Sequence, residues 1–193
     1  MGKVSKSILS RIVTSLRERT KLNQWKNSFS VIDWFKKLNN KETLSFLLFV
    51  FCPNITEDLL KKALEYAKNH VNISPEEVKI ILQTKKAFLF ADKKPWIKKG
   101  NKVFDVTMGS WDGAEVAELV GLYLLSQLTD LSLDVGLYRN DGLGVCKLPQ
   151  GKQNITAEAN LKTVNFLWLV SSHLYPVMVF SFKLEISMEN GIK

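Results

Sequence analysis

Two short apolar runs joined by a polar turn constrain the fold of this chain more than any other feature. The runs cover residues 135–138 and 143–146, and the turn between them is Arg139-Asn140-Asp141-Gly142. Asn, Asp and Gly favour tight turns because they tolerate positive φ or bond to the neighbouring backbone. The pattern therefore predicts a β-hairpin.

The rest of the chain predicts helices interleaved with short strands. Thr56 and Ser74 are expected to cap two helices, the second with Pro75 at its first position. Residues 44–51 form a continuous apolar run, which is typical of a buried strand. Helices are predicted over residues 4–19, 31–38, 56–69 and 114–128 and from Ser74 onward, a hairpin or loop around 92–94, and strands at 155–158 and 163–170. This order is α+β and suits an antiparallel sheet backed by helices.

The first predicted helix is basic and amphipathic. Val4, Ile8, Ile12 and Leu16 recur at helical spacing, so we expect them on the buried face. Its lysines and arginines leave two alternatives open: a solvated surface helix or a contact to nucleic acid.

The composition is that of a globular protein with a basic surface. The 193 residues are 46% hydrophobic and carry a formal net charge of +8, which favours polyanionic partners. A lysine-rich solvated surface explains the charge equally well. Two cysteines far apart and two histidines give no disulfide framework and little basis for zinc chemistry.

The termini indicate an intracellular protein. The first residues lack the apolar core of a signal peptide, so we expect location in the cytoplasm or nucleus rather than secretion. Residues 167–182 are strongly apolar but are interrupted by Ser171, His173 and Pro176 and fall short of a membrane span. We expect no membrane partner, and read this segment as a displaced core strand or a poorly specified terminus.

Several segments, in the right order, resemble reverse transcriptases. The turn from Tyr138 to Gly142 resembles their metal-binding hairpin of Tyr, any residue and two Asp, with Asn140 in place of the first Asp. The segment Gly109-Ser110-Trp111-Asp112-Gly113 resembles their Gly-x-x-Gln-Gly, with Asp112 where Gln is common. Residues 165–167 resemble a strand of Penelope-like elements, and residues 24–27, 104–110 and 158–160 resemble enzymes of animal mobile elements. The Asn-Asp-Gly turn alone would indicate only an ordinary hairpin.

The resemblance, which runs from Gly2 to Leu167, implies a partial right-hand polymerase. Residues 1–43 would be a fingers-like helical segment, residues 44–170 a degenerate palm, and residues 171–193 a diverged apolar tail. The family carries out RNA-directed DNA synthesis on an RNA or DNA template-primer, with magnesium held by carboxylates. By this resemblance Gly109, Asp112 and Gly113 would face nucleotide or template, and Tyr138, Asn140 and Asp141 would form the catalytic hairpin. No specific protein partner can be inferred.

Departures from the family pattern predict an inactive enzyme. The family's first palm strand carries a metal-binding Asp, whereas residues 44–51 contain no acid and look a few residues short. The nearest acids are Glu42, Glu57 and Asp58, and the last two are better explained as helix-start residues. Of three expected metal-site aspartates only Asp141 can be assigned. Loss of one metal ligand commonly costs orders of magnitude in rate, and loss of two should abolish synthesis.

Binding of nucleic acid could outlast the chemistry. Two aromatic candidates, Trp96 and Trp111, could stack on bases. The accompanying lysines are Lys85, Lys86, Lys93, Lys94, Lys98, Lys99 and Lys102, of which Lys98 and Lys99 are the predicted template contacts. A non-catalytic basic RNA/DNA-binding domain is therefore the alternative function. A solvated basic loop with core tryptophans, or a remnant without selected function, also remains open.

Overall fold

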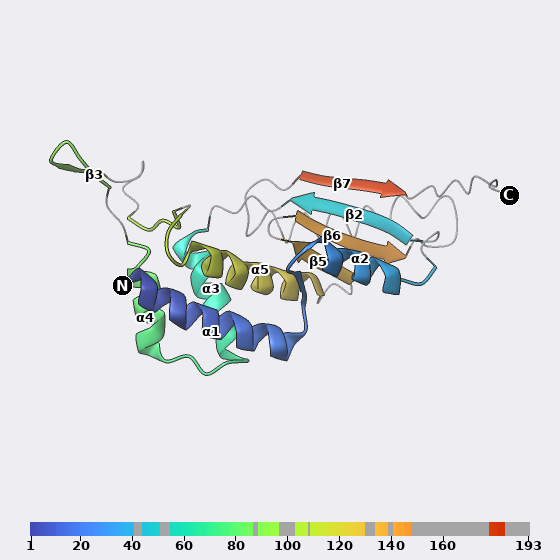
Figure 1. Ribbon diagram of the computed structural model, residues 1–193, viewed down its shortest axis with the longest axis horizontal. Helices are drawn as coiled ribbons and strands as arrows, with labels where there is room; N and C mark the ends of the chain where they lie inside the picture. Colours follow the sequence, from blue (N-terminus) through green and yellow to red (C-terminus); the bar gives the residue numbers. More distant parts are fainter. Residues whose placement is uncertain are drawn as a thin grey trace. The chain divides into compact units, whose positions relative to one another are not determined.

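The protein is mixed α+β (Figure 1). The computed structural model describes residues 1–40, 44–50, 55–86, 89–96, 103–107, 109–129, 134–138, 141–147 and 178–183. The elements are α1 (Gly2–Thr20), β1 (Asn23–Trp25), α2 (Ser28–Lys37), β2 (Leu44–Val50), α3 (Glu57–Lys68), α4 (Pro75–Gln83), β3 (Leu89–Ala91), β4 (Lys94–Trp96), α5 (Gly113–Thr129), β5 (Asp134–Tyr138), β6 (Asp141–Lys147) and β7 (Met178–Lys183).

The chain divides into two compact units, each formed by two separate stretches. Unit 1 comprises Met1–Gln24 and Asn54–Gln127, and unit 2 comprises Trp25–Pro53 and Leu128–Lys193. Unit 1 therefore contains α1, α3, α4, nearly all of α5 and the β3–β4 hairpin, while unit 2 contains α2 and most of the large sheet. The resemblance predicts a different division, into a fingers-like segment, a palm and a tail with boundaries at residues 43 and 170. That division stays a prediction.

The predicted first helix is confirmed as α1, but its buried face differs from the expected one. Leu9, Ile12, Val13 and Leu16 are buried, whereas Val4 is 51% exposed. Ser5 continues the buried stripe instead, because its hydroxyl bonds to a buried carboxylate. Ile8 is only half-buried, and Leu9 is buried in its place. The first two buried positions therefore lie one residue after those predicted, whereas Ile12 and Leu16 are buried as predicted.

The basic side chains of α1 bind other parts of unit 1. Lys6 lies 3.5 Å from Glu115 and Arg17 lies 3.2 Å from Glu118, so two ion pairs join α1 to α5. Arg19 donates a 2.6 Å hydrogen bond to the carbonyl of His70. These contacts, together with the Arg11–Glu77 ion pair at 2.6 Å, make α1 a helix that organises the unit.

Local capping explains where α3 and α4 begin, as predicted. The Thr56 hydroxyl accepts from the backbone N–H of Leu59, which satisfies one free donor at the start of α3. At α4, Ser74 accepts from the Glu77 N–H and the Glu77 carboxylate accepts from the Ser74 N–H. This reciprocal capping box also places Glu77 within reach of Arg11.

The large sheet has the strand order β1-β5-β6-β2-β7. The β5–β6, β6–β2 and β2–β7 pairs are antiparallel. The predicted hairpin is confirmed, but its turn is shorter than expected, because Asp141 already pairs with Tyr138 as the first residue of β6. The connection is therefore residues 139 and 140, which lie outside the described residues. Backbone pairing between β5 and β6 extends to Tyr138 and Asp141, although the sequence from Asn140 to Gly142 favours a turn.

A tryptophan pair holds α2 against this sheet. The Trp25 and Trp34 rings lie 5.2 Å apart, and the Trp34 indole N–H donates a 2.9 Å hydrogen bond to Asp134 on β5. Asn27 caps α2 by accepting from Ser30, so the helix begins three residues before the predicted start. The ring of Trp25 occupies the space above Gly136, where an added Cβ would lie 2.1 Å from the indole.

The apolar tail contributes a strand to the sheet. β7 pairs with β2 from Met178↔Val50 to Lys183↔Ser45, in agreement with the interpretation of this segment as a displaced core strand. The predicted strands at 155–158 and 163–170 lie outside the described residues, as does Glu42. Among the helices described, none is long and apolar enough to cross a membrane.

Replacement of Gly136 by Ala should disrupt the packing of Trp25 against Trp34 and the sheet. The added methyl group would overlap the Trp25 indole, so we expect a loss of about 1–3 kcal/mol in the free energy of unfolding. Gly144→Ala is the matched control, because its Cβ would meet Val135 at an ordinary 3.5 Å. Denaturant unfolding followed by tryptophan fluorescence measures both. Equal stability of the two variants would contradict this packing.

The Glu77 carboxylate should make stability depend on acid pH. Its pKa lies below the ordinary value of 4.5 because the Ser74 backbone N–H and then Arg11 stabilise the charged form. A lowered folded pKa stabilises the protein above the unfolded value, and this stabilisation is lost as the pH falls below about 4.5. Glu77→Gln keeps the capping acceptor but should cost about 0.5–1 kcal/mol at pH 7 and flatten this acid dependence.

Urea unfolding at pH 7 and pH 3.5 measures the effect, with Glu76→Gln as the neighbouring control. A Glu77→Gln protein whose stability falls with acid as steeply as that of the unaltered chain would refute the assignment.

Candidate functional site

The predicted catalytic hairpin brings Tyr138 and Asp141 directly opposite each other. They are the last register pair of β5 and β6, on the two sides of the residue 139–140 connection. Side chains of directly paired residues lie on the same face of an antiparallel sheet. Tyr138 is half-buried against the Trp25–Trp34 cluster, whereas Asp141 is exposed. The cluster therefore anchors the base of the hairpin and leaves the Asp141 carboxylate in solvent.

β2 lies next to this hairpin. It pairs antiparallel with β6 from Leu44↔Lys147 to Val50↔Asp141. The residue opposite the Asp141 carboxylate is thus Val50, and the sequence of β2, Leu-Ser-Phe-Leu-Leu-Phe-Val, contains no acid. β2 therefore places no acidic side chain beside Asp141.

These donors do not fit a two-metal centre. Two magnesium ions about 3.5–4 Å apart need several converging carboxylates, because Mg²⁺ demands hard oxygen ligands in octahedral geometry. In the part of the chain that the structure describes, no three His, Cys, Asp or Glu side chains converge. Asp141 alone can be placed at the predicted centre, and Asn140 lies outside the described residues.

The acids that follow β2 are engaged elsewhere. Glu57 and Asp58 form i,i+4 ion pairs with Lys61 at 2.8 Å and Lys62 at 3.0 Å. The hydrogen bond from Lys61 lowers the pKa of Glu57, which desolvation only partly opposes. This confirms the interpretation of both acids as helix-start residues of α3.

The predicted nucleotide-facing glycine segment is a compact loop at the start of α5. Gly109 has φ +81, a conformation that side chains other than Gly rarely adopt. A Cβ on Gly113 would lie 2.7 Å from the Ser110 hydroxyl and 3.3 Å from the Thr107 carbonyl. Gly109 therefore allows a positive φ that other residues rarely adopt. Gly113 allows Ser110 and Thr107 of the same loop to approach its backbone closely.

Asp112 lies in the interior of unit 1. Only 2% of it is exposed, and its carboxylate forms an ion pair with Lys85, which is also 2% exposed. The Ser5 hydroxyl donates a 2.5 Å hydrogen bond to the other carboxylate oxygen, and the Thr84 hydroxyl lies 3.4 Å from it. Asp112 thus joins α1, the end of α4 and the start of α5.

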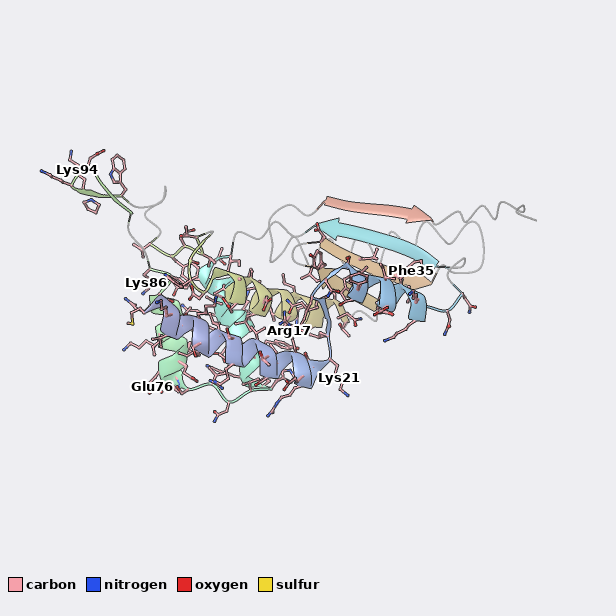
Figure 2. The ribbon with its side chains drawn as sticks, in the orientation of Figure 1. Arg17, Lys21, Phe35, Glu76, Lys86 and Lys94 are labelled. Carbon is pink, nitrogen blue, oxygen red and sulfur yellow. The ribbon has the colours of Figure 1, made fainter. Side chains whose placement is uncertain are left out.

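This geometry separates the predicted binding residues. The expectation that Lys85 belongs to a basic surface is wrong, because Asp112 draws its ammonium group inside. Asp112 itself, expected to face nucleotide, is turned to this internal partner. Lys86, Lys93 and Lys94 are exposed, while Lys98, Lys99 and Lys102 lie outside the described residues. Lys94 is labelled on the β3–β4 hairpin in Figure 2.

The two tryptophans proposed for base stacking are surface residues. Trp96 is 55% exposed and Trp111 is 64% exposed, so the alternative that they belong to the core is wrong. The Lys3 ammonium lies 4.8 Å from the centroid of the Trp111 ring, within cation–π range. Trp111 therefore already carries a cationic partner from α1.

The cluster of Ser5, Thr84, Lys85 and Asp112 was not predicted from the sequence. One signal was present: Asp112 directly precedes an apolar helix, a position that favours a negative charge. Its partners lie 27 and 107 positions away in the sequence, so no local pattern links them. Comparison with family models, with curated proteins and with solved structures gave no match.

The buried ion pair should show strong coupling in a double-mutant cycle. Lys85→Met alone would leave the Asp112 carboxylate buried without its cation, and Asp112→Asn alone would leave the Lys85 ammonium buried without its anion. Each should lower the free energy of unfolding by about 3–5 kcal/mol. The double variant should be markedly more stable than the sum of the two losses predicts. Asp58→Asn, in an exposed pair, should cost less than about 1 kcal/mol.

Asp112→Gln introduces the residue that is common at this position in reverse transcriptases, and it tests the same ion pair. Asp112→Gln should destabilise unit 1 about as much as Asp112→Asn, because neither amide neutralises Lys85. Thermal unfolding measures the difference from the unaltered chain. Unchanged stability in Asp112→Gln would mean that Asp112 is available to an external ligand.

Proposed function

We propose that this chain is a degenerate, truncated reverse-transcriptase domain of a mobile element, Penelope-like or of an allied class. Its ancestral activity is template-directed DNA synthesis by two-metal nucleotidyl transfer on an RNA or DNA template-primer. The chain itself has lost that activity. Its place of action would be the cytoplasm or nucleus, where such templates occur.

The observation that carries this proposal is the pairing of β2 with the β5–β6 hairpin. A palm needs a buried strand antiparallel to the hairpin that bears the metal ligands, and β2 runs there with Val50 opposite Asp141. In this reading residues 44–170 are the degenerate palm, which contains β2, β5 and β6, and residues 1–43 are the fingers-like segment that precedes it. Several sequence segments in family order support the same lineage.

The loss of activity follows from the ligands. β2 supplies no carboxylate, and position 140 supplies an amide in place of the first Asp of the pair. An amide oxygen carries no full negative charge and is a poorer magnesium ligand. Metal-assisted charge stabilisation contributes several kcal/mol to such reactions, so a centre without two of its three ligands should not support them.

A second candidate function is a non-catalytic domain that binds RNA or DNA. The observation that favours it is the exposure of Trp96 together with Lys93 and Lys94. Bases stack on aromatic side chains with little regard to sequence, and lysines contact the phosphates. Such binding would be non-specific and would weaken with salt.

Primer extension tests the loss of catalysis. We expect no incorporation of nucleotides on an RNA template with magnesium or manganese, at least 1000-fold below an active reverse transcriptase, on the order expected from lost metal ligands. Asn140→Asp should remain inactive, because the β2 carboxylate would still be missing. Incorporation by Asn140→Asp would show that another carboxylate serves as the missing ligand.

Asp141→Ala is the control for this assay. Activity of the unaltered chain that persists in Asp141→Ala would come from a contaminating polymerase. Incorporation that Asp141→Ala abolishes would instead show an active enzyme and contradict the proposal of lost catalysis.

A further inference from the structure

The β3–β4 hairpin exposes an aromatic ring and two cations within five residues. All residues from Asp92 to Trp96 are exposed. Lys94 pairs with Ala91 and Trp96 pairs with Leu89 across the two strands. Side chains two positions apart on a strand lie on the same face, so Lys94 and Trp96 share one face of the hairpin, about 7 Å apart. Lys93 extends this basic end at the turn.

The turn holds Lys93 in an unfavourable backbone conformation. Asp92 has φ 53 and Lys93 has φ 58, and both values are in the left-handed region. Tight two-residue hairpin turns require this conformation, but Gly is the favoured second residue because a Cβ is strained there. A lysine at this position therefore costs stability while it adds a cation beside Lys94. Backbone strain of this kind often occurs at functional sites. Here the strained Lys93 lies near the exposed ring of Trp96.

We propose that the β3–β4 hairpin binds single-stranded nucleic acid, with a base stacked on Trp96 and the adjoining phosphates bound by Lys93 and Lys94. This inference rests on the proposed nucleic-acid binding and assigns it to one site, separate from the catalytic hairpin. A ring exposed at a short two-stranded hairpin can reach the face of an unpaired base. The bases of a duplex are stacked on each other and present no such face.

The basic side chains set the ionic character of this site. Each lysine that contacts a phosphate releases counterions, so the affinity should fall as salt increases. Trp111, the other exposed tryptophan, has the Lys3 ammonium over its ring and lies outside this site. It therefore serves as an internal control for the effect of removing an exposed tryptophan.

Two turn variants separate binding from stability. Lys93→Gly and Asp92→Gly both relieve a left-handed residue, so both proteins should be at least as stable as the unaltered chain. Lys93→Gly removes a cation and should weaken binding and lower the slope of log K against log salt by about 0.7. Asp92→Gly removes an anion and should bind as tightly as the unaltered chain, or more tightly. A folding defect cannot produce this pair of results.

The experiment is fluorescence anisotropy of the full chain with a labelled 12-nucleotide RNA of mixed sequence, in 50 and 200 mM salt. The matching single-stranded DNA and an RNA duplex are titrated in parallel. We expect binding to both single strands and weaker binding to the duplex. Trp96→Ala should weaken single-strand binding about 5- to 100-fold, whereas Trp111→Ala should leave it unchanged.

Different failures of this experiment overturn different claims. No binding of the unaltered chain to RNA or DNA at low salt would overturn both the proposed nucleic-acid binding and this site. Binding that is equal in the Trp96→Ala, Lys93→Gly and unaltered proteins would leave nucleic-acid binding intact and overturn the hairpin site. Equal or tighter binding to the duplex would overturn the preference for single strands. Tighter binding to vesicles of phosphatidylserine, sensitive to the same substitutions, would identify the hairpin as a membrane contact and overturn the proposal.

Discussion

The ion pair between Lys85 and Asp112 is the constraint on which the architecture of unit 1 depends. Removing two charges from water costs several kcal/mol per ion, and their attraction offsets this only when further hydrogen bonds complete the site. Here Ser5 donates to the Asp112 carboxylate and Thr84 lies beside it, so α1, the end of α4 and the start of α5 must meet at one point. The ion pairs along α1 then extend the same arrangement toward the other end of α5.

The burial of Asp112 bears on the role of the segment from Gly109 to Gly113. By resemblance, its glycines would allow a nucleotide or template to approach the backbone. In the structure Gly113 instead makes room for Ser110 and Thr107 of the same loop, and Asp112 is held by Lys85. The segment can therefore be accounted for by the packing of unit 1 alone. The similarity in letters is the basis of the proposed lineage, while the physical contacts give no support for a retained ligand contact at Asp112.

Elements governed by local chemistry could be predicted from the sequence, and those governed by distant contacts could not. The Thr56 and Ser74 caps and both hairpins follow from residues within four positions of each other. Lys85 was expected on the surface, and Ser5 was not assigned to the buried face. The burial of Ser5 and Lys85 depends on a carboxylate in another segment, which no local pattern reveals. The same is true of Gly136, whose requirement comes from the Trp25 ring, and of the pairing of β7 with β2. At the candidate site, the adjacency of Tyr138 and Asp141 was predictable, whereas the exact partner of Asp141 on β2 was not.

A fold of this kind can lose its chemistry without losing its sheet. Backbone hydrogen bonds set the pairing of β2 with β6, and they do not depend on whether position 50 carries an acid or a valine. Carboxylates gathered to bind metal repel one another, so an active centre is itself a source of instability when no metal is bound. Val50, which pairs with Asp141, and Asn140, next to Asp141 in the sequence, carry no charge, so neither adds to such repulsion. Under the proposed function, the uncharged residues that argue against catalysis would also favour persistence of the β2–β6 pairing.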